Sequence, residues 1–268
     1  MEPLPISVLL LARDEAVRLA DLLPRLGFAR EVVVVVDAAT RDESRAVAAR
    51  FGARVFERAL DGFGPQRRFA LEQALEPWVL WIDADERLDA EAVASLPGAL
   101  ARAEVSGYRI ARATWFLGRR IRHCGWRGER VLRLFRRAAA SFDEAPVHER
   151  VHVTGTIADL TGGIEHRSYE RWEDCRDKLI RYAAAGAERA RRAGRRAHAA
   201  DVLLRPPLRF LRMYLLQAGF LDGAHGLVLC ALAAAQVLLK YAALWAQPPR
   251  VPGTPADATE TAGGRERG

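Results

Sequence analysis

The run EVVVVVD at residues 31–37 limits most strongly what this chain can fold into. β-branched residues favour strands, and a strand without polar alternation must be covered on both faces. A similar apolar run, ISVLLLA, occupies residues 6–12, and the segment EAVRLADLLPRL between the two runs has helical periodicity. Strand, helix and strand in this order predict a βαβ unit with a parallel sheet.

The alternation continues toward residue 83. A helix-like segment RDESRAVAARFG is followed by ARVFER, by a second helix-like segment QRRFALEQAL, and by the apolar run WVLWID. This order predicts a doubly wound, mostly parallel α/β sheet, whose ligands bind at the carboxyl ends of the strands. From about 105 to 166 the runs become short and alternating, which predicts antiparallel strands in a second layer of the same domain.

The stretch VLWIDADERL at residues 79–88 ends a buried strand on Asp83, Asp85 and Glu86. Mutual repulsion makes such a cluster costly unless solvent or a cation compensates it, so the stretch is a solvated turn or a metal site. Asp83 and Asp85 can present oxygen atoms to Mg²⁺ or Mn²⁺, and a cation held there would neutralise a diphosphate. A DxD pattern alone is most often a solvated turn, but Asp37 also ends a strand and strengthens the metal hypothesis.

The charge balance indicates acidic partners. The formal net charge is +7, and lysine occurs only at 178 and 240, so arginine supplies nearly all the positive charge. Arginine favours phosphates and carboxylates, which leaves nucleotides, nucleic acids and anionic lipids as candidate partners. Three cysteines far apart in the sequence predict neither a zinc knuckle nor a disulfide framework and suit a reducing compartment. The first residues lack a basic segment before the apolar run, so we expect a cytoplasmic chain.

The C-terminal third changes character. Residues 170–198 are helical and basic on one side, which is typical of a solvated helix face. A basic amphipathic helix is predicted after Pro206 and Pro207, because Arg205, Arg209 and Arg212 fall opposite apolar residues.

Gly219, Gly223 and Gly226 are expected to break this helix, and residues 226–246 are apolar over about 20 positions, the length that can span a bilayer. Gln236 and Lys240 favour a helix pair lying in the membrane interface; a spanning helix and plain core packing are the alternatives. The tail 248–268 is predicted to be disordered.

Several ordered segments resemble family 2 of the glycosyltransferases, and within it the bacterial lipopolysaccharide inner-core β-1,4-glucosyltransferase branch. They include ISVLLLARDEA, EVVVVVDAATRDES, GFGPQRRFAL, WVLWIDADERL, GWRGERVLRLFRR, PVHERV and EHRSY. The resemblance covers residues 5 to 246. It implies a GT-A fold, which we expect over residues 1–168, and the basic and apolar helices that follow predict a helical membrane-associating region over 169–247. It also implies a nucleotide-sugar donor, in this family usually a UDP-sugar, a divalent cation, and sugar transfer with inversion.

Roles for individual residues follow from the same resemblance. The donor nucleotide would be held by Arg13, Glu15, Asp37, Arg67 and Asp83. The metal would be bound by Asp85, with Asp83 and His166 as further contacts. Glu149 would be the catalytic base, with His148 beside it. Apart from the resemblance, Trp126, which follows Gly125, could stack on an acceptor sugar.

Alternatives remain for several of these positions. Asp143 and Glu144 are rival bases, or a solvated turn before Pro146. His166 is expected to have a structural role about as readily as a role as metal ligand. Trp126 is explained equally well as an ordinary residue of the hydrophobic core.

The favoured hypothesis is an enzyme at the cytoplasmic face of the bacterial inner membrane. It would move a sugar, such as glucose from UDP-glucose, to a glycan or lipid-linked acceptor such as lipopolysaccharide core, and the anionic membrane surface would hold it through its basic helices. An arginine-rich nucleic-acid-binding protein is the alternative from another class, but it has no recognised motif and leaves the acids at the strand ends unexplained, so no nucleic-acid partner is expected. A GT-A protein that binds nucleotides without catalysis is the other alternative.

Overall fold

The computed structural model describes residues 2–126, 128–142 and 151–246 of the 268-residue chain. Its contacts group into two compact units. The sheet unit consists of Met1–Arg122 and Trp126–Glu170, and the helical unit consists of His123–Gly125 and Arg171–Gly268.

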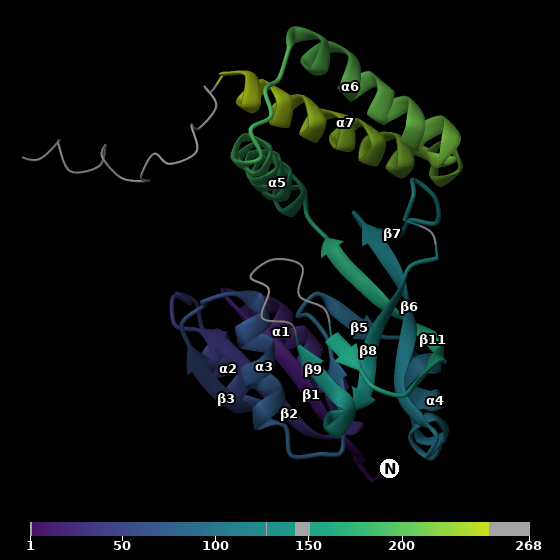
Figure 1. The fold of residues 1–268 in the computed structure, drawn as a ribbon. Helices are drawn as coiled ribbons and strands as arrows, with labels where there is room; N and C mark the ends of the chain where they lie inside the picture. Colours follow the sequence, from purple (N-terminus) through teal and green to yellow (C-terminus); the bar gives the residue numbers. More distant parts are fainter. Residues whose placement is uncertain (1, 127, 143–150, 247–268) are drawn as a thin grey trace, which may run out of the picture. The chain divides into compact units, whose positions relative to one another are not determined.

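One mixed sheet organises the sheet unit (Figure 1). Its strands, in their order across the sheet, are β3 (Arg54–Arg58), β2 (Ala29–Asp37), β1 (Leu4–Ala12), β4 (Trp78–Trp81), β8 (Arg130–Arg136), β6 (Val105–Phe116), β11 (Thr156–Tyr169) and β5 (Glu86–Leu88). A short strand β7 (Arg119–Arg120) pairs with β6, and β9 (Ala140–Phe142) pairs with β10 (Val151–Val153) separately.

The first half of the sheet confirms the doubly wound prediction. β1 runs parallel to both β2 and β4, and β2 runs parallel to β3. The central valines of β2 are at most 1% exposed: Val34 and Val36 belong to one hydrophobic cluster, and Val33 and Val35 belong to the other. Both faces of the sheet are therefore covered, which is why the strand contains no polar alternation.

The helices of the sheet unit connect these strands. They are α1 (Ala16–Leu22), which continues into the 3-10 turn η1 (Leu23–Leu26), α2 (Ser44–Arg50), α3 (Phe63–Gln73) and α4 (Ala90–Leu100). Leu19 of α1 and Leu96 of α4 are fully buried in the first cluster, while Ala70 of α3 packs in the second. The helix after residue 41 ends at Arg50, and Gly52 follows with a positive φ of 79°, as expected of a chain leaving a helix.

The prediction of a second, antiparallel layer over residues 105–166 is partly wrong. β6 and β8 are antiparallel, but β11 runs parallel to β6, and all three strands belong to the same sheet as β1. β4 offers a row of backbone donors and acceptors on its free edge, and β8 pairs with that edge from Trp78 to Leu80. Sequence alternation shows which face of a strand is buried, but not which edge the strand joins.

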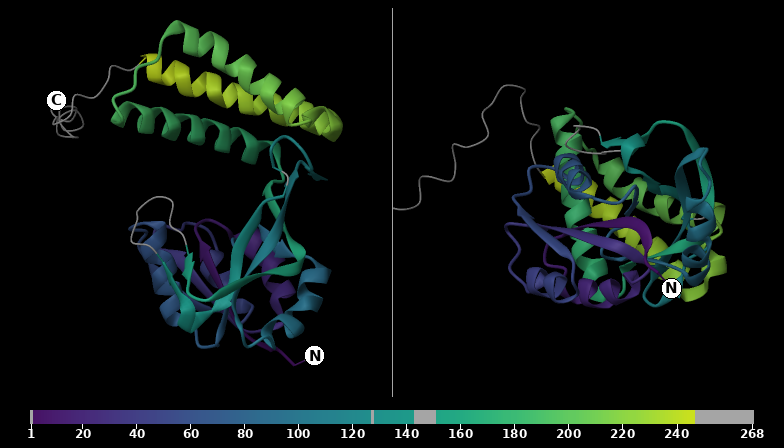
Figure 2. Two further views of the ribbon diagram at one scale, coloured as in Figure 1. Left: turned by 45° about the vertical axis from the view of Figure 1, so that its right-hand side comes forward. Right: turned by 90° about the horizontal axis from the view of Figure 1, so that it is seen from below.

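The helical unit contains α5 (Trp172–Arg192), α6 (Ala199–Leu211) and α7 (Gly223–Ala246). A π-helical turn η3 (Arg212–Leu216) and a 3-10 turn η4 (Gly219–Asp222) join α6 to α7. α7 packs against both α5 and α6, and Figure 2 shows the three helices side by side.

Two boundaries in this unit differ from prediction. α6 begins at Ala199, so Pro206 and Pro207 lie inside it, because Asp201 accepts a hydrogen bond from the backbone N–H of His198 and starts the helix earlier. Gly226 lies within α7 rather than in the break; a Cβ there would stand 2.0 Å from the carbonyl oxygen of Gly219, so close packing requires the glycine.

Asp222 anchors residues 123–125 to the C-terminal helices. Its side chain is 5% exposed and accepts a hydrogen bond from the backbone N–H of His123 at 2.8 Å. Cys124 Sγ lies 3.7 Å from Cys230 Sγ. Burial, then the neighbouring Cys230 and Asp222, raise the pKa of Cys124 to about 12, so the thiol stays protonated. All three cysteines are buried, and none of them forms a disulfide, which agrees with their wide spacing in the sequence.

Candidate donor and metal site

Two acids lie at the same edge of the sheet. Asp37 is the last residue of β2, and Asp83 follows β4 after one intervening residue, Ile82. Both strands run parallel to β1, so their carboxyl ends meet at this edge. Asp37 is 5% exposed; its Oδ1 accepts a hydrogen bond from the Ala39 N–H at 3.0 Å, and Arg13 Nη1 lies 3.2 Å from its Oδ2.

Glu86, the last acid of the stretch IDADE, stabilises the turn from inside the sheet unit. Glu86 is fully buried and lies 2.7 Å from Arg133, which also reaches Asp83 Oδ2 at 2.8 Å. Glu86 Oε2 in turn accepts a hydrogen bond from the backbone N–H of Asp83 at 3.2 Å. Burial by itself lowers the pKa of Arg133, but the charges of Asp83 and Glu86 outweigh it and raise the pKa, so the guanidinium stays charged. This buried ion pair holds the turn in shape.

Asp85 lies in a separate polar cluster with two side chains of β11. Its Oδ2 accepts a hydrogen bond from Ser168 Oγ at 2.6 Å and lies 3.6 Å from His166 Nε2. Ser168 Oγ is 2.7 Å from the same histidine nitrogen. The backbone carbonyl of Asp85 also accepts a hydrogen bond from the Arg167 N–H at 2.8 Å, which holds β11 against the turn. Asp85 and His166 are far apart in the sequence, and this backbone contact brings them together.

These side chains fit a divalent cation that is shared with a substrate. Within residues 2–126, 128–142 and 151–246, no three His, Cys, Asp or Glu side chains are arranged as a complete metal site. Asp85 and His166 therefore offer two ligands at most. Mg²⁺ is usually held in proteins by one or two carboxylates together with substrate phosphates and water, so a two-residue site suits a cation that arrives with a diphosphate.

The other residues predicted to bind the donor lie near the start of the sheet and on α3. Arg13 follows β1 and its side chain is 56% exposed. Glu15 precedes α1, where its carboxylate pairs with Arg18 at 2.9 Å. Arg67 lies on α3, with its guanidinium 4.6 Å from the ring centroid of Trp81. The ion pair of Arg13 joins it to Asp37.

The predicted acceptor side is described only in part. Trp126 stacks on Tyr169, with ring centroids 5.9 Å apart and an angle of 21° between the planes. His148 and Glu149, together with the rival bases Asp143 and Glu144, lie outside the described residues.

Sequence reasoning missed Arg133 and Ser168. Arg133 stands in β8 between Leu132 and Leu134, and a charged residue within such an apolar strand is a signal for a buried ion pair. Ser168 stands two residues after His166, so both side chains point to the same face of β11. That spacing could have grouped the two residues, but not with Asp85.

Comparisons with known proteins identify a family for the chain. The model of the family described as "Glycosyl transferase family 2" matches residues 17–151. The chain is 30% identical over 253 residues to the lipopolysaccharide core biosynthesis glycosyltransferase LpsC of Rhizobium meliloti, covering 89% of this chain and 94% of the relative. It is 24% identical over 235 residues to an uncharacterized glycosyltransferase of Rickettsia typhi, covering 83% of this chain and 80% of that protein.

Solved structures are more distant. A crystal structure of S. aureus TarS, residues 1–349, aligns with a TM-score of 0.46 and 14% identity over 88% of this chain and 91% of that one. Glucosyl-3-phosphoglycerate synthase from Mycobacterium tuberculosis, solved with Mn²⁺, UDP and glucosyl-3-phosphoglycerate, aligns with a TM-score of 0.33 and 19% identity over 50% of this chain and 57% of that one.

Proposed function

Because the chain belongs to glycosyltransferase family 2, we propose that it transfers a sugar, with inversion, from a nucleotide-diphosphate donor to a membrane-associated glycan or lipid acceptor. The observation that carries this proposal is the pairing of Asp85 with His166 at the sheet edge where Asp37 and Asp83 also lie. The name of the Rhizobium meliloti relative supports lipopolysaccharide core as the acceptor class. UDP-glucose is the donor that we would test first.

Each group at the edge has a distinct task in this proposal. Asp37 and Arg13 contact the uracil and ribose, with Glu15 and Arg67 nearby, while Asp83 contacts the ribose or the cation. Asp85 and His166 would hold Mg²⁺ or Mn²⁺, and a bound cation would neutralise the negative charge of the diphosphate. Ser168 donates to Asp85 and orients it.

The acceptor needs a base on the opposite side of the reacting carbon. Glu149 takes the proton of the acceptor hydroxyl as that oxygen attacks the anomeric carbon, and His148 orients the carboxylate. Trp126 provides an aromatic surface for the acceptor sugar, and its stacking on Tyr169 keeps the indole in a defined position.

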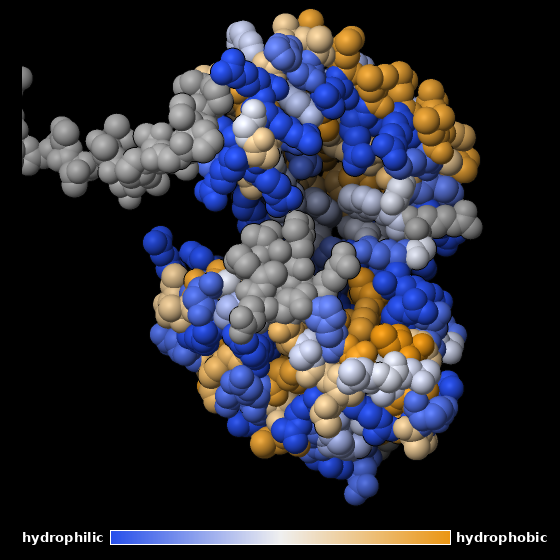
Figure 3. All heavy atoms as spheres, viewed as in Figure 1, coloured by the Kyte–Doolittle hydropathy of each residue, from blue (hydrophilic) through white to orange (hydrophobic). Residues whose placement is uncertain are grey.

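An exposed apolar surface on the helical unit supports membrane association. Figure 3 shows it as a band of hydrophobic side chains over α6 and the neighbouring turns. It includes Leu203, Leu204, Leu208, Leu211, Leu215, Leu216, Phe220 and Leu221, all at least 47% exposed. Arg205 and Arg209 interleave with these residues, so the same surface offers apolar side chains to a bilayer and positive charge to its anionic headgroups.

We infer that α7 lies along the membrane surface and does not cross it. One helical stretch, Gly219–Ala246, is long and apolar enough to span a bilayer, and 17% of its most apolar window is buried. However, α5 packs against α7, with Gly186 facing the Lys240 side chain. α5 carries charged residues along its length, and each charge near the bilayer centre costs about 2.5–3.5 kcal/mol. A spanning α7 would draw these charges into the hydrocarbon.

The enzymatic proposal is tested with purified full-length protein and a panel of nucleotide sugars. We expect slow hydrolysis of one donor in the presence of Mg²⁺ or Mn²⁺, abolished by EDTA and restored by excess cation. Transfer to isolated lipopolysaccharide core then identifies the acceptor class. Salt-sensitive DNA binding without turnover of any nucleotide sugar would contradict the proposal.

Membrane association is tested by flotation with vesicles. The protein should float with vesicles that contain anionic lipid. High salt should release much of it, because an interfacial helix is held partly by attraction between its arginines and the anionic headgroups, and salt screens this attraction. Retention of all the protein in high salt and alkaline carbonate would indicate a spanning helix. A protein that ignores anionic vesicles would contradict the membrane hypothesis altogether.

A further inference from the structure

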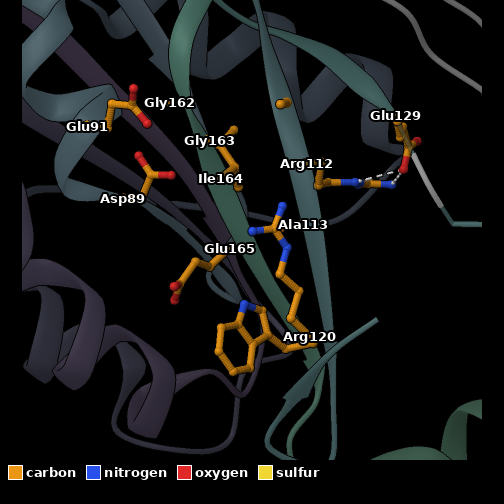
Figure 4. Close-up of a pocket in the computed structure, with 13 residues that line it drawn as sticks. Asp89, Glu91, Arg112, Ala113, Arg120, Glu129, Gly162, Gly163, Ile164 and Glu165 are labelled. Carbon is orange, nitrogen blue, oxygen red and sulfur yellow. Dashed lines mark hydrogen bonds and ion pairs between the residues drawn. The ribbon is translucent and has the colours of Figure 1, made fainter. Parts of the chain in front are cut away.

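A cavity of about 320 Å³ opens on the sheet unit between β6, β11 and the start of α4 (Figure 4). The proposed function does not use it. Glu165 lines this cavity, whereas His166 of the candidate metal site is the next residue of β11. Consecutive side chains of a strand point to opposite faces, so Glu165 and His166 serve different faces of β11.

Small residues make the floor of the cavity. Gly163 is paired with Ala111, and Glu165 with Ala113, across the parallel strands β11 and β6. Gly162 has a φ of 86°, and a Cβ there would stand 2.1 Å from the Ala92 nitrogen. Gly162 therefore lets the start of α4 pack closely on β11, whereas Gly163, Ala111 and Ala113 fill less space than the larger side chains that strands usually carry.

The wall of the cavity offers hydrogen-bond donors without partners. The Arg120 side chain forms no hydrogen bond or ion pair with any other described residue, and Figure 4 shows it extending from β7 toward the middle of the labelled residues. Trp115 also lines the cavity, and its indole Nε1 is buried without a hydrogen-bond partner among the described residues. Arg120 is exposed and reaches solvent, whereas an unsatisfied buried donor such as the Trp115 indole costs about 1–3 kcal/mol, which a ligand oxygen can offset.

Carboxylates supply the matching acceptors. The residues around the cavity include the acids Asp89, Glu91, Glu129 and Glu165 and the bases Arg112 and Arg120. Four negative and two positive charges give the lining a net charge of minus two, and Arg167, which pairs with Glu165 at 2.7 Å, reduces it to minus one; an anionic ligand is still disfavoured. Arg112 is already paired with Glu129 at 2.7 Å, so Arg120 is the base that remains for a ligand.

We propose that this cavity binds a single uncharged sugar ring, as a second carbohydrate site separate from the donor and metal site. Carboxylates accept hydrogen bonds from ring hydroxyls, while Arg120 and the Trp115 indole donate to sugar oxygens. The volume is near the lower end of the range of about 300–1,000 Å³ for small-molecule sites, which suits one ring rather than an extended chain. The natural occupant would be a neutral sugar residue of a glycan, and in the proposed function that glycan is the acceptor.

The test observes the Trp115 indole directly in full-length protein. The chain has six tryptophans, so a ¹H–¹⁵N spectrum shows few indole signals, and Trp115→Phe identifies the one from this site. Methyl glycosides of glucose, galactose and mannose are titrated separately. We expect at least one of them to shift the Trp115 signal in a saturable way and to leave most other indole signals unchanged.

Two variants and one control complete the experiment. Arg120→Ala and Glu165→Gln should each weaken sugar binding about tenfold, because each removes a charge-assisted hydrogen bond. Arg119→Ala removes a neighbouring exposed arginine of β7 that does not line the cavity, and should bind as wild type. Thermal unfolding of all variants checks that the fold is kept.

Three outcomes would overturn the proposal. They are the absence of any shift with all three glycosides, an equal shift in Arg120→Ala, and a shift with Mg²⁺ or spermidine but not with sugars, which would make the cavity a cation site. Binding of UDP with Mn²⁺ is measured on the same samples. Pocket variants should keep it, and a wild-type protein that binds a sugar but not UDP would refute the proposed function and leave the sugar site standing.

Discussion

The sheet unit and the helical unit differ in how far their leucine side chains are exposed to water. In the sheet unit, Leu9, Leu10 and Leu80 are fully buried. In the helical unit, Leu203 is 70% exposed and Leu216 is 84% exposed, while its buried residues are mostly small or sulfur-containing. Burial of apolar surface away from water drives folding, so leucines left in water by one unit need another apolar environment.

This contrast indicates that the two units remove their apolar side chains from water in different ways, the sheet unit in its own core and the helical unit against a membrane. The sheet unit completes its core by itself, with helices on both faces of the sheet. The helical unit uses small residues such as Ala183 and Ala187 to pack its helices closely, and many of its larger apolar side chains face outward. Chemistry and membrane binding should therefore respond to different substitutions.

The variant with the largest expected effect should lose catalysis and keep membrane binding. Glu149→Gln should lower transfer about 10²–10⁴-fold, since this range is typical of losing a general base. Affinity for UDP and for anionic vesicles should stay at wild-type values. Rates at saturating donor, calorimetry with UDP and vesicle flotation measure the three quantities.

Asp143→Asn and Glu144→Gln are the matched controls for that variant and should retain most activity. If Glu144→Gln is the inactive one, the base is misassigned although the transfer reaction stands.

The next effect concerns the candidate metal site. Asp85→Asn should lower transfer about 10²–10³-fold, the range for losing one electrostatic contact to the transition state, and raise the Mn²⁺ concentration needed for activity. Asp159→Asn removes a carboxylate from an exposed ion pair with Arg109 and should change activity little. Metal titration of activity decides the matter: an unchanged Mn²⁺ requirement in Asp85→Asn would exclude this carboxylate as a ligand.

Replacing a leucine by alanine in each unit tests the difference between the two units most directly. Leu10→Ala should lower the free energy of unfolding by about 2–5 kcal/mol, because Leu10 is fully buried in the core. Leu208→Ala should leave that quantity within about 0.5 kcal/mol, because Leu208 is 62% exposed, and should instead weaken vesicle binding about tenfold. Denaturant unfolding and flotation on both variants provide the measurement. A destabilised Leu208→Ala protein would mean that α6 is covered by protein rather than lipid.

The smallest effect tests a buried carboxylate of the sheet unit. Burial by itself raises the pKa of Glu31, but hydrogen bonds from Ser7 and the Leu75 N–H and the ion pair with Arg54 outweigh it and lower the pKa. A depressed pKa stabilises the folded state above the unfolded value of 4.5, and this stabilisation is lost as the pH falls through the folded pKa.

Glu31→Gln should therefore lower the free energy of unfolding by about 1–3 kcal/mol at neutral pH, and the difference from wild type should shrink below pH 4.5. Unfolding across this range of pH measures the difference, and a constant difference would show that the carboxylate charge is not the cause. Vesicle binding at neutral pH should not change, since Glu31 belongs to the sheet unit.

Much of the fold could be predicted because its signals are local. The valines of β2 required cover on both faces, and the helix after residue 41 ended where a glycine allowed a positive φ. The first and last residues of a helix were harder to predict where hydrogen bonds outside the apolar pattern determine them. The prolines of α6 suggested a later start, whereas the cap formed by His198 and Asp201 begins the helix at Ala199, well before Pro206.

The sequence by itself determined that strands alternate with helices, that acids follow two parallel strands, and that the C-terminal helices carry more apolar surface than a core requires. Hydrophobic periodicity and residue type carry this information, since each acts over a few neighbouring positions. Only the tertiary structure decided that β11 runs parallel to β6, that Glu86 is a buried partner of Arg133, and that Asp85 meets His166. These depend on which strand edges pair, and pairing across a sheet joins residues whose separation along the chain leaves no local pattern.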